Sequence, residues 1–186
     1  LNDCMTCSVG FRAPSVSNLI SEYAEFIAAA IDREQRYQDP DLRCQQSPAE
    51  IRRAVLTRIK TLLTEQLTVD DDKLLRWFGE FSSEPRSGLH PAPPETQHAS
   101  FHELCATLTQ ETRTAQASAS KFLYARHDDQ AWLFVDGKTY ATSRAFAAAL
   151  SDNRNLSTRD VLASIADPVD ERVLLDLYNN GQLIIQ

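Results

Sequence analysis

Hydrophobic side chains in the first half of the chain recur at steps of three and four residues, the spacing that places them on one face of an α-helix. This pattern predicts a first helix over residues 17–31. A second is expected over residues 47–66, because Ser47-Pro48-Ala49-Glu50 has the pattern of a capping box with proline at the first helical position. A third, over residues 70–81, opens with three aspartates, whose charge suits the N-terminal end of a helix dipole.

The second half of the chain alternates short helical and strand patterns. Residues 82–97 contain four prolines and no hydrophobic period, so they predict a linker. Beyond it, turns at Asp128-Asp129 and Asp136-Gly137 separate the apolar runs. We expect helices over residues 99–108, 144–150, 158–166 and 167–179, and strands over residues 121–126, 131–135, 138–141 and 183–185. A few helices with a small sheet resemble the winged-helix class.

Residues 4–11 alternate between two faces, as a β-strand does. Thr6 and Ser8 fall on a small, polar face, while Met5, Val9 and Phe11 fall on an apolar one. A strand at the end of a chain with no partner in the neighbouring sequence is not stable by itself. We therefore expect it to be the last strand of a further domain.

These patterns predict an α+β protein. Its expected parts are a terminal strand (1–14), a helical region (15–81), a proline-rich linker (82–97) and a winged-helix-like domain (98–186). The helical region has more apolar surface than so small a bundle can bury. Because the interface of an obligate dimer resembles a core cut in half, we expect this region to form a dimer. The candidate interface residues are Leu19, Tyr23, Phe26, Ile27, Trp77 and Phe78.

Charge argues against nucleic-acid binding. The 186 residues carry 26 acidic and 19 basic side chains, a net charge of −7, and residues 91–186 sum to −4. The expected recognition helix holds Arg159 beside Asp160, and the hairpin tip is acidic, so these elements repel phosphate. We therefore expect no DNA partner. A basic patch across the sheet would weaken this expectation, and it would need Lys121, Arg126, Lys138 and Arg144 to converge.

The remaining composition favours a soluble protein of the cytoplasm. No run of 18 apolar residues is present, so we expect no membrane partner. Four cysteines are too few and too scattered for the disulfide framework of a small secreted protein, and we expect free thiols.

Two pairs of residues have a spacing found in metal sites. Cys4-x-x-Cys7 lacks the second pair that a zinc knuckle needs, and strand alternation sends the two thiols to opposite faces. His98 and His102 lie one helical turn apart with Glu103 nearby, but the pattern specifies no third ligand. We interpret them as an exposed first turn after a linker, and predict no metal site.

Several ordered tracts resemble one bacterial family. They are Met-Thr-Cys-Ser-Val-Gly-Phe-Arg-Ala-Pro (5–14), Tyr-Gln-Asp-Pro-Asp (37–41), and Trp-Phe-Gly-Glu-Phe (77–81) followed by Ala-Pro-Pro-Glu (92–95). The family is that of the cupin-type, JmjC-like ribosomal oxygenases. These are Fe(II)- and 2-oxoglutarate-dependent hydroxylases, typified by an enzyme that hydroxylates an arginine of a large-subunit ribosomal protein.

The resemblance implies a chain that is the C-terminal part of such an enzyme. In the family, a double-stranded β-helix with a His-x-Asp…His iron triad precedes a helical dimerisation region and a winged helix. We expect the triad to be absent here, and this segment to be inactive alone. The parent protein would use Fe(II) and 2-oxoglutarate and act on a ribosomal protein as a homodimer.

The resemblance also assigns a place to two residues of the terminal strand. The family's last barrel strand reads Asn-x-Ser and faces iron and cosubstrate. The corresponding residues are Thr6 and Ser8, and Thr6 departs from the family's asparagine.

A second interpretation from another class stays open. The chain can be a stand-alone winged-helix or adaptor protein that acts through protein–protein contacts. The genomic sequence before Leu1 distinguishes the two, since a cupin barrel supports the first and a nearby start codon the second.

Overall fold

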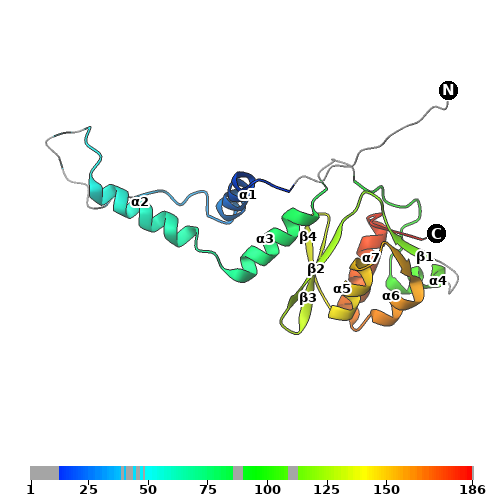
Figure 1. Ribbon diagram of the computed structural model, residues 1–186. Helices are drawn as coiled ribbons and strands as arrows, with labels where there is room; N and C mark the ends of the chain where they lie inside the picture. The colour runs from blue at the N-terminus through cyan, green and yellow to red at the C-terminus, as the bar shows by residue number, and fades with distance from the viewer. Residues whose placement is uncertain are drawn as a thin grey trace, which may run out of the picture. The chain divides into compact units, whose positions relative to one another are not determined.

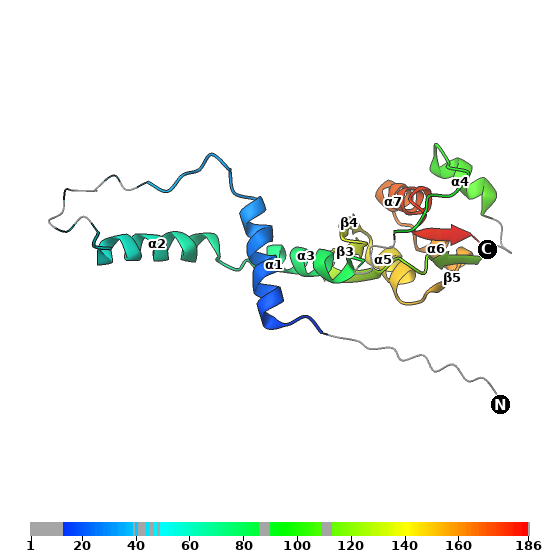
Figure 2. The same ribbon diagram turned by 90° about the horizontal axis from the view of Figure 1, so that it is seen from above.

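The chain forms two compact units in a computed structural model, shown in two views in Figures 1 and 2. We call Leu1–Val69 the N-terminal unit and Asp70–Gln186 the C-terminal unit. The strand predicted over residues 4–11 lies outside the described part of the chain. The structure describes residues 13–38, 40, 44, 47, 49–85, 90–108 and 113–185.

The N-terminal unit contributes two helices, α1 (Val16–Ala29) and α2 (Arg53–Gln66). The Ser15 side chain caps α1 by accepting a hydrogen bond from the backbone N–H of Asn18 at 3.1 Å. The expected start of α2 at residues 47–50 was wrong. Its first residue is Arg53, and the backbone N–H of Glu50 instead closes a turn on the carbonyl of Ser47 at 3.1 Å.

The C-terminal unit contains an antiparallel three-stranded meander. Its strands are β2 (Phe122–His127), β3 (Gln130–Val135) and β4 (Lys138–Thr142), as the sequence pattern predicts. Asp136 and Gly137 connect β3 to β4 with φ angles of 50° and 81°. Two positive φ values in a two-residue loop are the geometry for which Asp-Gly is favoured in hairpins.

A second antiparallel sheet has the order β5-β1-β6, with β1 (Arg113–Gln116), β5 (Asn155–Ser157) and β6 (Leu183–Ile185). Of these strands only β6 was predicted. The other two are three or four residues long and largely polar, so they have no apolar alternation to detect.

Among its described residues, the C-terminal unit also contains five helices, and a side-chain oxygen of Ser or Asp caps each N-terminus. Helix α7 ends where Gly181 takes a φ of 74°, and the N–H of Gln182 then reaches the carbonyl of Leu177 at 2.9 Å. All five were expected from the sequence, within a few residues. They are α3 (Asp71–Ser83), α4 (Phe101–Thr107), α5 (Arg144–Ser151), α6 (Thr158–Ser164) and α7 (Pro168–Asn179).

Both faces of the meander are packed. One face contributes Phe122, Leu133 and Val135 to the main core, and the other presents Phe134 to α3. This explains why β3 reads as an almost continuous apolar run. The predicted α+β class is confirmed. The main core also contains Leu104, Phe146, Leu150, Leu156, Val161, Val173, Leu174, Leu177 and Leu183.

Candidate functional site

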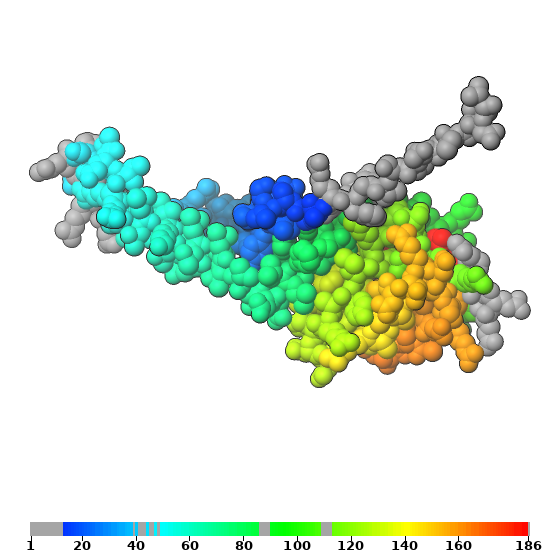
Figure 3. Space-filling model, viewed as in Figure 1, coloured from blue at the N-terminus to red at the C-terminus, as the bar shows by residue number. Residues whose placement is uncertain are grey.

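Helix α2 carries an uncovered apolar face. None of its residues is buried, and Leu56, Leu63 and Leu67 are 55%, 49% and 44% exposed. These positions are spaced by seven and four residues, so they form one stripe along the helix. The helix surface is shallowly hollowed along this stripe, and Figure 3 shows α2 in cyan to green. The hollow is lined by Leu56, Ile59, Lys60, Leu63, Thr64, Leu67 and Thr68.

Helix α1 carries four of the six interface residues predicted from the sequence. Leu19, Tyr23, Phe26 and Ile27 are half-buried and share one stripe. The rings of Tyr23 and Phe26 stack, with their centroids 6.3 Å apart. On the same helix, the side chain of Ile20, next to Leu19, is largely exposed.

Exposed apolar surface is concentrated in the N-terminal unit. Among the described residues, 14 large hydrophobic side chains are exposed, and ten of them lie between Val16 and Val69. A monomeric protein rarely leaves so much apolar surface in contact with water. The N-terminal unit is therefore the better candidate for contact with another protein chain.

The other two predicted interface residues, Trp77 and Phe78, lie on α3. Trp77 is 7% exposed, and its ring stacks on that of Phe81 with centroids 5.4 Å apart. Phe78 is 49% exposed. Because Trp77 is already covered within one chain, only Phe78 has substantial surface left for a partner.

Polar contacts tie α3 to the meander of the C-terminal unit. The Thr139 hydroxyl donates to the Glu80 carboxylate at 2.6 Å, and the N–H of Gly137 donates to the Ser83 hydroxyl at 3.0 Å. Lys121 donates to the carbonyls of Ser82 and Glu84, both at 3.4 Å. The lysine charge thus sits at the C-terminal end of α3, where the helix dipole favours it.

The basic residues of the sheet lie at both of its ends. Lys121 donates to the carbonyl of Ser82 at the C-terminal end of α3. Arg144 donates to the carbonyls of Asp128 and Gln130 at the β2–β3 turn. Arg126 pairs with Ala131 beside that turn, whereas Lys138 lies at the opposite end of the meander, opposite Val135. The four residues therefore do not converge at one place, because Arg126 and Arg144 lie at the β2–β3 turn and Lys121 and Lys138 lie at the opposite end of the meander.

A His-x-Asp sequence lies at the turn between β2 and β3. His127-Asp128-Asp129 does have the His-x-Asp spacing, although we expected that pattern to be absent. The His127 ring stacks on Trp132 with centroids 4.0 Å apart, and its Nε2 lies 3.2 Å from a carboxylate oxygen of Asp72. Within the described ranges, no three His, Cys, Asp or Glu side chains are grouped to hold a metal ion.

His98 takes part in packing at the end of the linker. Its ring lies 5.4 Å from that of Tyr178, and its backbone exchanges two hydrogen bonds with the Asn179 side chain at 3.0 Å and 2.9 Å. His102 is exposed on α4. The structure therefore ties His98 to the C-terminal end of α7. Cys4, Cys7, Thr6 and Ser8 lie outside the described residues.

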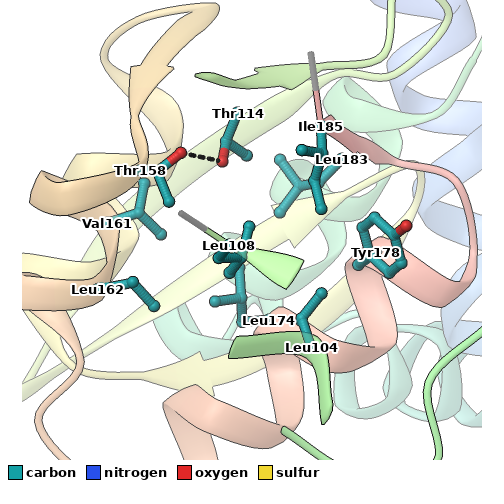
Figure 4. Close-up of a pocket in the computed structure, with 10 residues that line it drawn as sticks. All are labelled: Leu104, Leu108, Thr114, Thr158, Val161, Leu162, Leu174, Tyr178, Leu183 and Ile185. Carbon is teal, nitrogen blue, oxygen red and sulfur yellow. Dashed lines mark hydrogen bonds between the residues drawn. The ribbon is translucent and has the colours of Figure 1, made fainter. Parts of the chain in front are cut away.

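A small apolar pocket lies between α4, α6, α7 and the second sheet (Figure 4). The hydroxyls of Thr114 and Thr158 hydrogen-bond to each other across 2.9 Å, so they are paired within the chain. The side chains that line the pocket include no acid, histidine or cysteine, and its polar groups are the hydroxyls of Thr114, Thr158 and Tyr178. Its lining is Leu104, Leu108, Thr114, Thr158, Val161, Leu162, Leu174, Tyr178, Leu183 and Ile185.

Two ionisable groups of the C-terminal unit are perturbed. Burial, and then the charge of Glu171, raise the pKa of the Cys105 thiol above its ordinary value. Burial, followed by the charges of Asp176 and Asp136, raises the pKa of the Tyr140 hydroxyl. Both shifts favour the neutral form, so neither group is activated as a nucleophile or a base.

Comparison with known proteins shows that the chain is similar to part of the ribosomal oxygenases. A curated relative, the ribosomal protein uL16 3-hydroxylase of Escherichia coli K12, is 28% identical over 97% of the chain and 47% of its own length. Solved structures of the E. coli ribosomal oxygenase YcfD are 26% identical over 96% of the chain. One has a TM-score of 0.74, and one bound to cobalt and 2-oxoglutarate a TM-score of 0.73. The chain spans about half the length of these relatives.

No helix in the described part of the chain is long and apolar enough to cross a membrane.

The matches to ribosomal oxygenases confirm the family resemblance seen in the sequence. The family model described as "ROXA-like winged helix" matches residues 63–183, which include α3 as well as the later elements. The chain belongs to the ROXA-like winged-helix family.

Proposed function

We propose that this chain is the C-terminal dimerisation and winged-helix portion of a ribosomal protein hydroxylase that depends on Fe(II) and 2-oxoglutarate. The observation that carries the proposal is the match of 97% of the chain to 47% of a uL16 3-hydroxylase. The structural likeness to a ribosomal oxygenase bound to cobalt and 2-oxoglutarate supports the cofactor assignment for the whole protein.

The described residues do not fit an iron site, so the chemistry would belong to the remainder of the enzyme. A 2-oxoglutarate oxygenase holds iron with two histidines and one carboxylate on one face of the metal. His127 and Asp129 have the His-x-Asp spacing of an iron triad, but the His127 ring, at the end of β2, is stacked on the ring of Trp132 in β3. Thr6 and Ser8 remain proposals for residues that line the cosubstrate pocket.

We assign two supporting roles to this portion. The apolar faces of α1 and α2, with Phe78, would join two copies into a homodimer, because ten of the 14 exposed large hydrophobic side chains among the described residues lie in the N-terminal unit. The C-terminal unit would act in protein contacts rather than bind DNA, because residues 70–186 carry 17 acidic against 11 basic side chains. The substrate would be a ribosomal protein, reached in the cytoplasm.

The proposal is tested on the intact gene product that contains this chain. Purified with Fe(II) and 2-oxoglutarate, it should add one oxygen atom to a ribosomal protein, as read by peptide mass spectrometry. Removal of residues 13–186 should abolish dimerisation and reduce this activity. If no ribosomal protein gains oxygen, the hydroxylase assignment fails.

The segment alone should be inactive and dimeric. We expect no turnover of 2-oxoglutarate by the 186-residue chain, and a dimer mass by light scattering at micromolar concentration. Stoichiometric iron binding that is lost when His98 or His102 is replaced by alanine would contradict the assignment of the metal to the rest of the enzyme. A monomer mass would refute dimerisation and favour the adaptor interpretation.

A further inference from the structure

The chain contains one Asn-Gly sequence, Asn180-Gly181, at the C-terminal end of α7. In such a sequence the asparagine side-chain amide can be lost without an enzyme, because glycine has no side chain to hinder attack by its backbone nitrogen. Asn180 is exposed to water, whereas Gly181 is buried. The two groups that would react therefore lie at the boundary between solvent and the interior of the C-terminal unit.

The second half of the linker lies against this end of α7. A Cβ atom on Gly181 would overlap the carbonyl of Ala92, so the two backbones are in close contact. The Asn179 side chain accepts a hydrogen bond from the His98 N–H at 3.0 Å and donates one to the His98 carbonyl at 2.9 Å. These contacts hold residues 92–98, which we call the strap, against the end of the helix.

The end of α7 holds Gly181 in a geometry that blocks the reaction. The Gly181 N–H donates to the carbonyl of Tyr178 at 2.8 Å. The ψ angle of Asn180 is −1°, whereas attack requires a rotation about this bond that turns the Gly181 nitrogen toward the Asn180 side chain. That rotation moves Gly181 against the carbonyl of Ala92. The reaction therefore requires the helix end to open and the strap to lift.

We propose that Asn180 is a deamidation site that the docked strap keeps unreactive and that local opening of the strap exposes. In the open state, the Gly181 nitrogen gives its proton to a hydroxide ion and forms a bond to Cγ of Asn180. The Cγ–Nδ2 bond breaks, and Nδ2 leaves as ammonia after taking a proton from water. A second water molecule then opens the cyclic imide at one of its two carbonyls, which leaves aspartate or isoaspartate at position 180.

The modification acts on the strap in turn. Either product places a carboxylate at the C-terminal end of α7, where the helix dipole disfavours negative charge. Isoaspartate also adds one atom to the backbone before Gly181. This displaces the N–H that is bonded to Tyr178 and the α-carbon that contacts Ala92. Opening of the strap thus promotes the modification, and the modification promotes opening of the strap.

The rate of deamidation in the folded chain is the first test. The 186-residue chain is incubated at mildly alkaline pH, and peptide mass spectrometry follows the replacement of the side-chain nitrogen of Asn180 by oxygen. The same chain in urea gives the unprotected rate. Because only the locally open fraction reacts, the folded chain should deamidate at least about tenfold more slowly. Equal rates would overturn the proposal.

Two substitutions test whether the strap provides the protection. N179A removes both hydrogen bonds to His98 and should raise the rate in the folded chain by about threefold or more, relative to the rate of the same variant in urea. Q97A removes the weaker bond from its side chain to the Asn179 carbonyl and should raise this ratio less. T96A, at an exposed position of the strap, is the matched control and should leave it unchanged. An N179A protein as protected as the wild type would refute the role of the strap.

Hydrogen exchange tests the effect of the modification on the strap. Anion-exchange chromatography separates the modified chains by their added negative charge. The His98 N–H, which is bonded to Asn179 in the unmodified chain, should exchange at least about threefold faster in the isoaspartate fraction. N180D supplies the charge without the extra backbone atom and should show a smaller increase. Unchanged exchange in the isoaspartate fraction would show that the modification does not release the strap, and that part of the proposal would fail.

Discussion

Gly79 of α3 lies directly against the ring of Phe134 in β3, so closely that a Cβ atom on the glycine would overlap three carbon atoms of the ring. The missing side chain lets the helix backbone approach the outer face of the meander. Contacts from Glu80 and Ser83 to the β4 side then fix its position along the sheet. Helix α3 is therefore part of the packing of the C-terminal unit.

Alanine at position 79 should destabilise the protein. At an exposed helical site the same change stabilises by about 1 kcal/mol, because glycine is a poor helix former. Here the added methyl group must displace Phe134, and overpacking of this kind costs about 1–3 kcal/mol. Urea unfolding followed by circular dichroism measures the change. Lys73→Ala, at an exposed position of the same helix, is the control and should be nearly neutral.

A second substitution shows whether Phe134 is the cause. Combining G79A with F134L should cost less than the sum of the two single changes, because the smaller side chain makes room for the methyl group. A G79A protein more stable than the wild type would contradict the close packing.

Asp170 should be the most sensitive carboxylate of the C-terminal unit. It is fully buried in the first turn of α7, and its two oxygens accept the backbone N–H groups of Ser143 at 2.9 Å and Ala166 at 3.0 Å. D170A leaves both donors without their partner and should cost about 2–4 kcal/mol of unfolding free energy. D170N keeps one acceptor and should cost less. D176A, at an exposed position of α7, should change stability by under about 0.5 kcal/mol.

The sequence predicted those elements that carry strong local signals. The meander was recognised from apolar runs separated by Asp-Gly, and the end of α7 from Asn-Asn-Gly before a strand. Strands β1 and β5 were missed because residues distant in sequence hold them together. Arg113 pairs with Ser157, and Thr114 with Leu156. No local pattern encodes such a pairing.

The candidate interface was predicted in part. A stripe of apolar residues shows that a face will be buried, but not whether the same chain or another one buries it. Trp77 and Phe78 are neighbours in sequence, yet Trp77 is covered within one chain and Phe78 is exposed. None of the six predicted interface residues lies on α2, although the structure leaves the apolar stripe of that helix exposed.

Cys44 should react with thiol reagents faster than Cys105. The thiolate is the reactive form, and burial and Glu171 raise the pKa of Cys105, so less thiolate is present at pH 8. Cys44 is exposed, whereas Cys105 is only partly accessible. Timed alkylation with iodoacetamide and peptide mass spectrometry gives both rates in one sample. Equal rates would show that the environment of Cys105 does not protect it.

Alkaline pH should destabilise the C-terminal unit partly through Tyr140. Its pKa is raised in the folded state, chiefly by burial and then by Asp176 and Asp136, so the folded protein holds the phenolic proton more tightly than the unfolded chain. The contribution of Tyr140 to the free energy of unfolding is fully present below the pKa of about 10 that tyrosine has in the unfolded chain. It is lost as the pH rises through the higher pKa of the folded state. Urea midpoints between pH 8 and 11 should fall less steeply in Y140F. An unchanged slope would contradict the shift.

Nucleic-acid binding by the C-terminal unit should be absent, for reasons of charge placement. Two of the four basic residues on the meander and α5, Lys121 and Arg144, already donate to backbone carbonyls. The remaining two, Arg126 and Lys138, lie near opposite ends of the sheet. Because phosphate neutralisation supplies most nonspecific affinity, dispersed charges of this kind give little binding.

Fluorescence anisotropy at low salt, where phosphate contacts are strongest, provides the test. Titration of the chain with random-sequence duplex DNA and with ribosomal RNA should show no salt-dependent binding at micromolar concentration. Because α2 is basic, the same titration is run on R53E/K60E, which removes any contribution of that helix. Binding that persists in this variant and weakens with salt would place phosphate contacts in the C-terminal unit and refute the prediction. The slope of log affinity against log salt would then count those contacts at about 0.9 per phosphate for duplex DNA.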